Sequence, residues 1–183
     1  MPDPAFTQLV DSHYAALYRF ALSLARNTAD ASDLVQQTFF IWSHKGGMLR
    51  DTSKARTWLF TTLYREFLRL RRHDARATSL EDLPADQDEI ASEDIDRVRR
   101  LDASQVITAL QSVPDTYRAP LTLFYLESLS YQEIAHTLDI PIGTVMSRLS
   151  RGKAQLRRLL AEPSTSADAK VVPFEPSSRT KSS

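Results

Sequence analysis

The chain contains no cysteine, only four glycines and no net charge. Without cysteine there is no disulfide framework, no Cys-x-x-Cys redox pair and no thiolate metal site. No apolar run approaches the roughly 20 residues that a membrane span needs, and the first residues lack the basic-then-apolar order of a signal peptide. We therefore expect a cytoplasmic protein without membrane insertion. Its 42% hydrophobic content over 183 residues suffices for a core and argues against general disorder.

The neutral total is the sum of unlike segments. Residues 1–78 carry 11 basic residues (Lys or Arg) and 7 acidic residues (Asp or Glu). Residues 97–160 carry 9 basic and 5 acidic residues, so each segment has a net charge of +4. Between them, residues 79–96 hold eight acidic residues and no basic one. Two basic blocks favour binding to a polyanion, and the acidic connector has a different role.

The shortage of glycine and the long 3.6-residue periodicity predict an all-α protein. Helices are expected over residues 6–26, 30–44, 53–73, 95–112, 114–127, 130–138 and 142–160. They group into two small helical domains, over residues 5–76 and 101–161, joined by a flexible acidic linker over 77–100. Residues 162–183, rich in Ser, Thr and Pro, are expected to form a disordered tail.

A helix-turn-helix is predicted near the C-terminal end. Ser130 and Glu133 have the spacing of a capping box, and Pro141 prevents the first helix from continuing. Arginine can form bidentate bonds to guanine, while hydroxyls and a helix N-terminus hold phosphate. An amphipathic helix with a merely solvated basic side is the alternative. The side chains expected to contact DNA are Thr144, Ser147, Arg148, Arg151 and Lys153.

Residues 113–135 and 140–149 resemble region 4 of bacterial RNA polymerase sigma factors, most closely those of the small extracytoplasmic-function (ECF) class. In that family the module binds the minus-thirty-five promoter element and the flap of the polymerase β subunit, which the resemblance implies here too. Two positions depart from the family pattern. Asp139 stands where glycine is usual, although Asp tolerates the left-handed conformation. Met146 stands where lysine is common, which removes one expected phosphate contact.

The N-terminal helices carry a second motif. The run Asp33–Trp42 resembles the sigma-factor segment, typically DLVQETF, that binds the clamp helices of the polymerase β′ subunit, with Gln37 in place of Glu. An outward phenylalanine among polar side chains suggests a protein contact. Packing of Phe40 under the first helix is the alternative. The residues expected to bind core polymerase are Asp33, Gln36, Gln37 and Phe40.

Arginines interleaved with one aromatic on the third helix suit a melted DNA strand, because bases stack on rings and cations follow phosphates. Trp58–Thr61 resembles the start of the family's minus-ten helix, and residues 46–54 correspond to the loop that captures a flipped base. Arg65 departs from the family, which usually has Asn there. A surface helix with a half-buried tryptophan is the alternative. The residues expected to contact minus-ten DNA are Arg50, Lys54, Trp58, Thr61, Arg65 and Arg69.

The resemblance thus implies an alternative sigma factor that binds core RNA polymerase and promoter DNA, with an anti-sigma factor as regulator. No enzyme activity, cofactor or metal is expected, because the four histidines are scattered and no nucleotide-binding or nucleophile motif occurs. Two other classes stay open. A stand-alone helix-turn-helix regulator would bind DNA as a dimer without polymerase, and a protein-only adaptor would not need Arg148 or Arg151.

Overall fold

The computed structural model describes residues 4–46, 49, 51–74 and 103–161. Within these ranges the chain forms seven α-helices and one short 3-10 helix, and no strand, so the prediction of an all-α protein is confirmed. The elements are α1 (Pro4–Ala25), α2 (Thr28–Lys45), η2 (Thr52–Lys54), α3 (Ala55–Asp74), α5 (Ala103–Ser112), α6 (Asp115–Tyr125), α7 (Tyr131–Leu138) and α8 (Ile142–Ala161). The predicted linker and tail lie outside the described residues.

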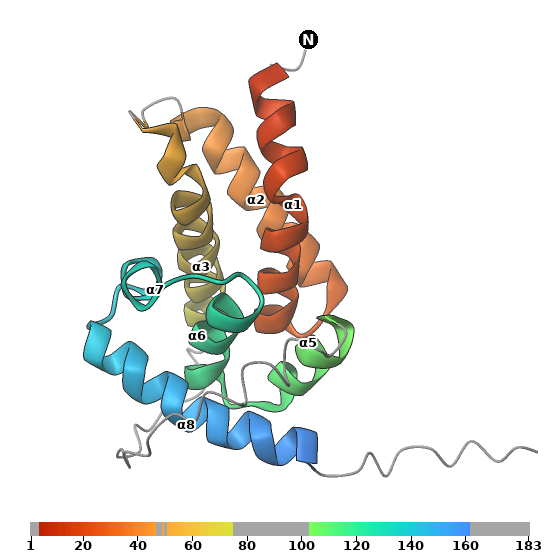
Figure 1. The fold of residues 1–183 in the computed structure, drawn as a ribbon. Coiled ribbons are helices and arrows are strands. Elements are labelled where there is room, and N and C mark those ends of the chain that lie inside the picture. Colours follow the sequence, from red (N-terminus) through yellow and green to blue (C-terminus); the bar gives the residue numbers. More distant parts are fainter. Residues whose placement is uncertain (1–3, 47–48, 50, 75–102, 162–183) are drawn as a thin grey trace, which may run out of the picture.

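Helices α1, α2 and α3 pack against one another and form an N-terminal module (Figure 1). Its interior is apolar because each helix turns one hydrophobic stripe inward. Two aromatic rings meet edge-on within it, Phe20 of α1 and Phe60 of α3, with centroids 5.5 Å apart. Leu70, toward the C-terminal end of α3, is 41% exposed.

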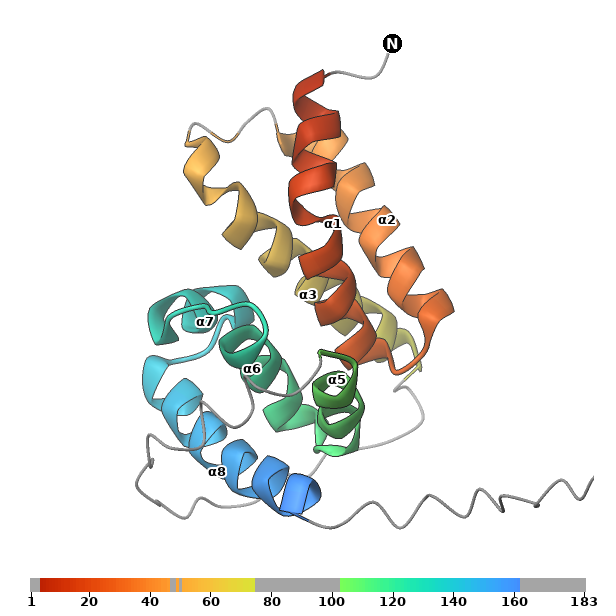
Figure 2. The ribbon, with the colours of Figure 1, turned by 45° about the vertical axis from the view of Figure 1, so that its right-hand side comes forward.

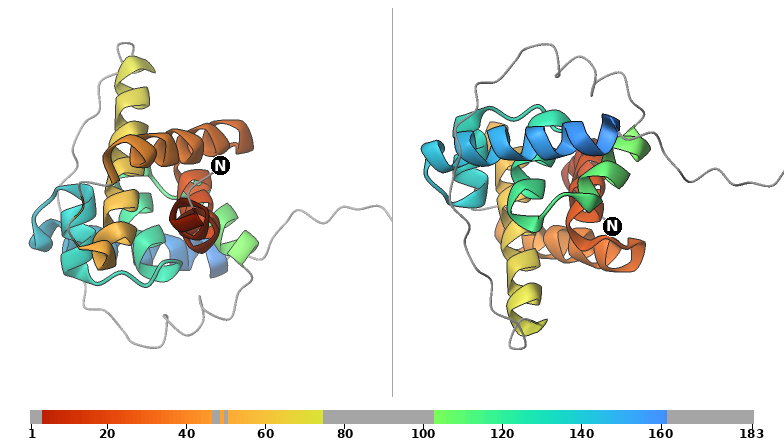
Figure 3. Two further views of the ribbon diagram at one scale, coloured as in Figure 1. Left: turned by 90° about the horizontal axis from the view of Figure 1, so that it is seen from above. Right: turned by 90° about the horizontal axis from the view of Figure 1, so that it is seen from below.

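Helices α5 to α8 form a C-terminal module, in which α8 contacts both α5 and α6 (Figure 3). Its buried residues include Leu110 of α5, Leu121 of α6, Ile134 of α7 and Leu149 of α8. Helix α6 contains Pro120, which is buried within the module. The two modules are in direct contact, with α6 against α1 and α7 against α3 (Figure 2).

The helix ends follow the sequence closely. Asn27 caps α2 by accepting a hydrogen bond from the Asp30 amide, so this helix begins earlier than expected. Ser130 and Glu133 form the predicted capping box at the start of α7. Asp139 ends α7 with a positive φ of 55°, the left-handed conformation that the family usually gives to glycine. The predicted helix-turn-helix geometry is therefore confirmed.

Gly152 lets α8 approach α6 closely. A Cβ atom added there would lie 2.8 Å from Leu121 Cδ1 and 2.9 Å from Tyr117 Cβ. We predict that Gly152→Ala lowers the free energy of unfolding by about 1–3 kcal/mol, the usual cost of overpacking a core. Urea denaturation followed by circular dichroism measures this change.

Gly143 provides the matched control, because it lies in the same helix and an added Cβ there meets nothing within 4 Å. Gly143→Ala should be neutral or stabilising, since alanine favours a helix over glycine by about 1 kcal/mol. Equal unfolding free energies for the two variants would contradict the close approach at Gly152.

Candidate nucleic-acid and polymerase interfaces

The residues expected to bind polymerase lie together on α2. Asp33, Gln36, Gln37 and Phe40 are all exposed, at the i, i+3, i+4 and i+7 positions of one helix face. The Phe40 side chain is 60% exposed, and its ring contacts only the ring of His44 among the aromatic pairs of the described residues, with centroids 4.5 Å apart. Phe40 does not pack under α1, so that alternative is wrong. The exposed phenyl ring of Phe40 is thus surrounded by two amides and a carboxylate, and a surface of this kind is suited to binding another protein.

The expected minus-ten residues lie along α3 and the segment before it. Lys54 and Arg65 are exposed. Arg69 is exposed and forms an ion pair with Glu66, with 2.8 Å between Nη2 and Oε2. Trp58 is half-buried and meets Trp42 edge-on, with ring centroids 5.0 Å apart. Arg50 lies outside the described residues.

Thr61 differs from the others. Its side chain is buried, and its hydroxyl donates a hydrogen bond to the Thr57 carbonyl at 2.8 Å. Together with Trp58 and Arg65 it lines a groove of about 590 Å³ whose other wall is α7 of the C-terminal module. The face of α3 that was expected to contact minus-ten DNA is therefore turned toward α7 of the helix-turn-helix.

The loop before α3 is held by its own side chains. The Asp51 carboxylate accepts hydrogen bonds from the Ser53 amide at 3.0 Å and the Ser53 hydroxyl at 2.6 Å, and these bonds lower the pKa of Asp51. Gly46 is buried beneath Trp42, where an added Cβ would fall 2.4 Å from the indole ring. Residues 47, 48 and 50 lie outside the described residues, so a base-capturing role for 46–54 stays a prediction.

The recognition helix α8 begins directly after Pro141, as in a helix-turn-helix. Thr144, Ser147, Arg148 and Arg151 lie on one side of it and are half-buried. Burial raises the pKa of Tyr64 on α3, and the charges of Arg148 and Arg71 oppose this rise. The Nε and Nη2 atoms of Arg151 are buried without a hydrogen-bond partner among the described residues.

Lys153, expected to contact DNA, lies inside the C-terminal module instead. Its side chain is buried, with the ammonium 4.7 Å from the centre of the Phe124 ring and 5.7 Å from that of Tyr125. A cation placed over aromatic faces is attracted by their quadrupoles. The sequence held a signal for this placement, because Lys153 comes four residues after Leu149 and three before Leu156, both on the buried stripe.

Two acidic residues that sequence reasoning missed connect the modules. Glu127, almost fully buried, accepts a bidentate contact from Arg19 of α1, with distances of 3.1 and 3.2 Å. Arg56 of α3 donates to the Glu127 carbonyl oxygen and lies 3.7 Å from its carboxylate. Burial raises the pKa of Glu127, and the two arginines offset part of the rise.

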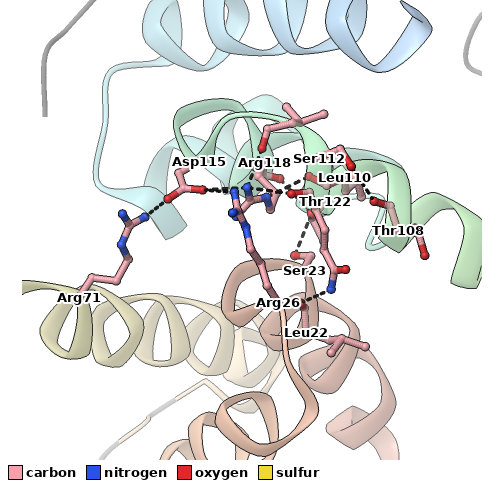
Figure 4. Close-up of polar contacts among 12 residues, drawn as sticks. Leu22, Ser23, Arg26, Arg71, Thr108, Leu110, Ser112, Asp115, Arg118 and Thr122 are labelled. Atoms are coloured by element: carbon pink, nitrogen blue, oxygen red, sulfur yellow. Dashed lines mark hydrogen bonds and ion pairs between the residues drawn. The ribbon is translucent and has the colours of Figure 1, made fainter. Parts of the chain in front are cut away.

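Asp115 forms the second connection (Figure 4). Its carboxylate pairs with Arg26 at 3.0 Å, with Arg71 of α3, and with Arg118 of its own module at 2.8 Å. Burial by itself would raise the pKa of Asp115, but the three arginines outweigh it and hold the pKa below its usual value. Charged Asp115 is therefore stabilised where the modules meet.

The described residues contain no helix with the length and apolar character of a membrane span. They also contain no group of three or more His, Asp or Glu side chains placed to hold a metal ion.

Comparison with known proteins covers both modules. The profile of the family Sigma-70 region 2 matches residues 9–77, and that of Sigma-70, region 4 matches residues 103–156. The ECF RNA polymerase sigma factor SigM of Bacillus subtilis is 33% identical over 150 residues, covering 78% of this chain and 87% of that protein. SigE of Mycolicibacterium smegmatis is 36% identical over 172 residues, and the match covers 88% of this chain but only 64% of that protein.

Among solved structures, the sigma factor RpoE in complex with the anti-sigma factor NepR from Bartonella quintana matches with a TM-score of 0.67 at 28% identity. The match covers 86% of this chain and 98% of that one. The structure of CnrH in complex with the cytosolic domain of CnrY matches with a TM-score of 0.60 at 26% identity, covering 85% of this chain and 87% of that one. The two family profiles in order and the agreement with SigM identify the chain as a member of the ECF RNA polymerase sigma factors.

Proposed function

We propose that this chain binds core RNA polymerase and directs it to a promoter, where it stabilises the open strand and holds the upstream duplex. The observation that carries the proposal is the pairing of an exposed, aromatic-centred face on α2 with a capped helix-turn-helix in one chain. A stand-alone regulator needs the second feature but has no use for the first. The chemistry of transcription belongs to the polymerase, so we infer no catalytic activity for the chain itself.

The proposed division of labour follows the two modules. Residues 5–76 act as region 2, in which Asp33, Gln36, Gln37 and Phe40 contact the β′ clamp helices. Residues 101–161 act as region 4, which contacts the β flap and the minus-thirty-five element, and residues 77–100 connect the two. A chain with this function works in the cytoplasm, beside polymerase and DNA.

The DNA contacts are proposed from charge and exposure. In the N-terminal module we assign the melted minus-ten strand to Lys54, Trp58, Arg65 and Arg69, whose cations and indole suit phosphates and unstacked bases. In the C-terminal module we assign the minus-thirty-five duplex to Thr144, Ser147, Arg148 and Arg151. Buried Lys153 is not assigned to DNA.

An anti-sigma factor is a further proposed partner. The solved structures that resemble this chain include RpoE in complex with NepR and CnrH in complex with the cytosolic domain of CnrY. A protein that covers the DNA-reading faces would keep the chain from promoters until it is released.

Run-off transcription with purified core polymerase on genomic fragments tests the proposal. We expect specific transcripts that require both the chain and core polymerase. Absence of core-dependent initiation on every fragment, together with tight binding of the chain alone to palindromic half-sites, would favour a stand-alone regulator instead.

We predict that Phe40→Ala weakens assembly with core polymerase by about thirtyfold, the effect of removing a central aromatic side chain worth about 2 kcal/mol at an interface. Fluorescence titration of labelled chain with core enzyme measures the dissociation constant. Tyr14→Ala is the matched control, because Tyr14 is an exposed aromatic of α1, 45% accessible, outside the proposed face. Equal losses for both variants would remove Phe40 from the interface.

A further inference from the structure

The start of α8 carries two exposed apolar side chains. Ile142 is 45% exposed and Met146 is 48% exposed, and they lie one turn apart within the first five residues of the helix. A single exposed apolar residue is ordinary on a protein surface. Two neighbours are different here, because they occupy the end of the recognition helix that meets base edges in a helix-turn-helix. The pair therefore calls for a contact that its position can make.

The pair lies outside the core of the C-terminal module. Val145 and Leu149 are fully buried and carry the packing of this part of α8. Gly143 is exposed, and a Cβ atom added there would meet nothing within 4 Å, so this side of the helix is open within the described part of the chain. The first turn of α8 lies at the outer edge of the molecule, beside α7 (Figures 1 and 2). Ile142 and Met146 are therefore accessible to a partner.

The charge of α8 favours duplex DNA as that partner. The helix contains five Lys or Arg and no acidic residue. A protein interface is depleted of charge at its centre, whereas a polyanion attracts an unbroken set of cations. The residues that flank the pair, Thr144, Ser147 and Arg148, are those assigned above to the minus-thirty-five duplex. Ile142 and Met146 would then face the major groove together with them.

The chemistry of the major groove offers an apolar side chain one specific partner. The base edges there present hydrogen-bond donors and acceptors, and thymine adds its C5-methyl group, which apolar side chains contact. Pressed against a guanine or cytosine edge, Ile142 and Met146 would remove water from polar groups and leave them unpaired, which costs free energy. A lysine in place of Met146 would instead bind a phosphate, a contact that carries no sequence information. The apolar pair therefore discriminates between base pairs.

We propose that Ile142 and Met146 are specificity-determining residues: they contact the C5-methyl group of a thymine in the minus-thirty-five element and so select an A·T pair at that position. The proposal rests on the proposed function, since it concerns the duplex that is assigned there to the C-terminal module. Hydrogen bonds from Ser147 and Arg148 read the neighbouring bases. Burial of the one methyl group strengthens binding by about fourfold.

Replacing thymine with deoxyuridine tests the contact, because it removes the methyl group and keeps the base pairing. In a promoter found by run-off transcription, footprinting locates the upstream element, and each of its thymines is replaced singly on both strands. Gel-shift titration with the holoenzyme measures the affinity for each duplex. We expect one position at which deoxyuridine weakens binding about fourfold, the effect of one methyl group. An element without thymine, or one in which no replacement weakens binding by more than about a quarter of that effect, would overturn the proposal.

The double variant Ile142→Ala, Met146→Ala shows whether these two side chains read the methyl group. The ratio of its affinities for the thymine and deoxyuridine duplexes should fall to about one, as in a double-mutant cycle whose interaction is lost. Leu159→Ala is the matched control, because Leu159 is an exposed apolar residue, 37% accessible, near the other end of α8. It should keep the full ratio. A double variant that also keeps it would show that the methyl group acts without Ile142 and Met146, which would overturn the proposal.

Met146→Lys gives a readout that a structural role would not change. We expect it to reduce the thymine preference and to steepen the salt dependence of binding by about one phosphate contact. If the double variant assembles poorly with core polymerase and its complexes keep the thymine preference, the pair is a protein contact and the proposal is wrong. A promoter complex that ignores deoxyuridine overturns this inference alone, whereas the absence of any core-dependent promoter complex overturns the proposed function.

Discussion

Replacing Arg118 with methionine is expected to lower the free energy of unfolding by about 3–5 kcal/mol, as for one partner removed from a buried charge network. The side chain is 1% exposed. Its Nε donates to the Leu110 carbonyl at 2.9 Å, and its Nη2 donates to the Val113 carbonyl at 2.6 Å and pairs with Asp115 at 2.8 Å. Arg118 thus supplies donors for carbonyls at and just after the end of α5, where helix carbonyls lack their usual intrahelical partners.

Methionine fills a similar volume but donates nothing, so the Val113 carbonyl would lose the donor described here and the Leu110 carbonyl would keep only the Val113 amide, at 3.0 Å. A buried carbonyl left unpaired costs about 1–3 kcal/mol. The total free energy of unfolding of such a protein is only about 5–15 kcal/mol. We therefore expect the C-terminal module of the variant to be partly unfolded at 37 °C. Urea denaturation measures the change, and Arg158→Met at an exposed site of α8 is the control. A difference under about 1 kcal/mol between the two variants, within the range of an ordinary surface change, would contradict the role of Arg118.

The double variant Arg148→Ala, Arg151→Ala is expected to weaken promoter binding by the holoenzyme about a hundredfold or more, because each bidentate contact to a base is worth about 1–3 kcal/mol. The holoenzyme is the form to test, since the proposed function assigns promoter binding to the chain together with core polymerase. Gel-shift titration at several salt concentrations gives both the affinity and the salt slope.

Two variants on the same helix give the comparison. Arg157→Ala removes an exposed cation outside the proposed arc and should cost little. Lys153→Met removes a cation that lies over two aromatic rings, so it should alter stability and leave DNA affinity nearly unchanged. If Lys153→Met weakens DNA binding as much as the double variant, the placement of Lys153 inside the module is contradicted.

The fold was predictable because its signals are local. The capping box of Ser130 and Glu133, the turn at Asp139 and the stop at Pro141 each depend on residues a few positions apart. Helical periodicity also predicted both modules and their order. The assignment of Lys153 to DNA was wrong, because it was judged by its charge and not by its position on the buried stripe of α8.

The site was predictable only in part. Spacing alone did not determine whether Phe40 is exposed or packs under α1. The structure shows that its side chain is exposed. The contact between the modules had no sequence signal, because Glu127 meets Arg19 across 108 positions and Asp115 meets Arg26 across 89. Periodicity describes the face of one helix, and it carries no information on which distant arginine that face will meet.

The edge-on pair of Trp42 and Trp58 has a practical consequence. The chain has only these two tryptophans, and both belong to the N-terminal module, with Trp58 at the groove that α7 covers. Tryptophan emission from the unlabelled protein therefore comes from the N-terminal module alone, and Trp58 emits from the groove between the modules. Indole emission shifts to longer wavelength when water replaces an apolar neighbour. The molecule thus carries its own optical reporter of whether its two halves are together or apart.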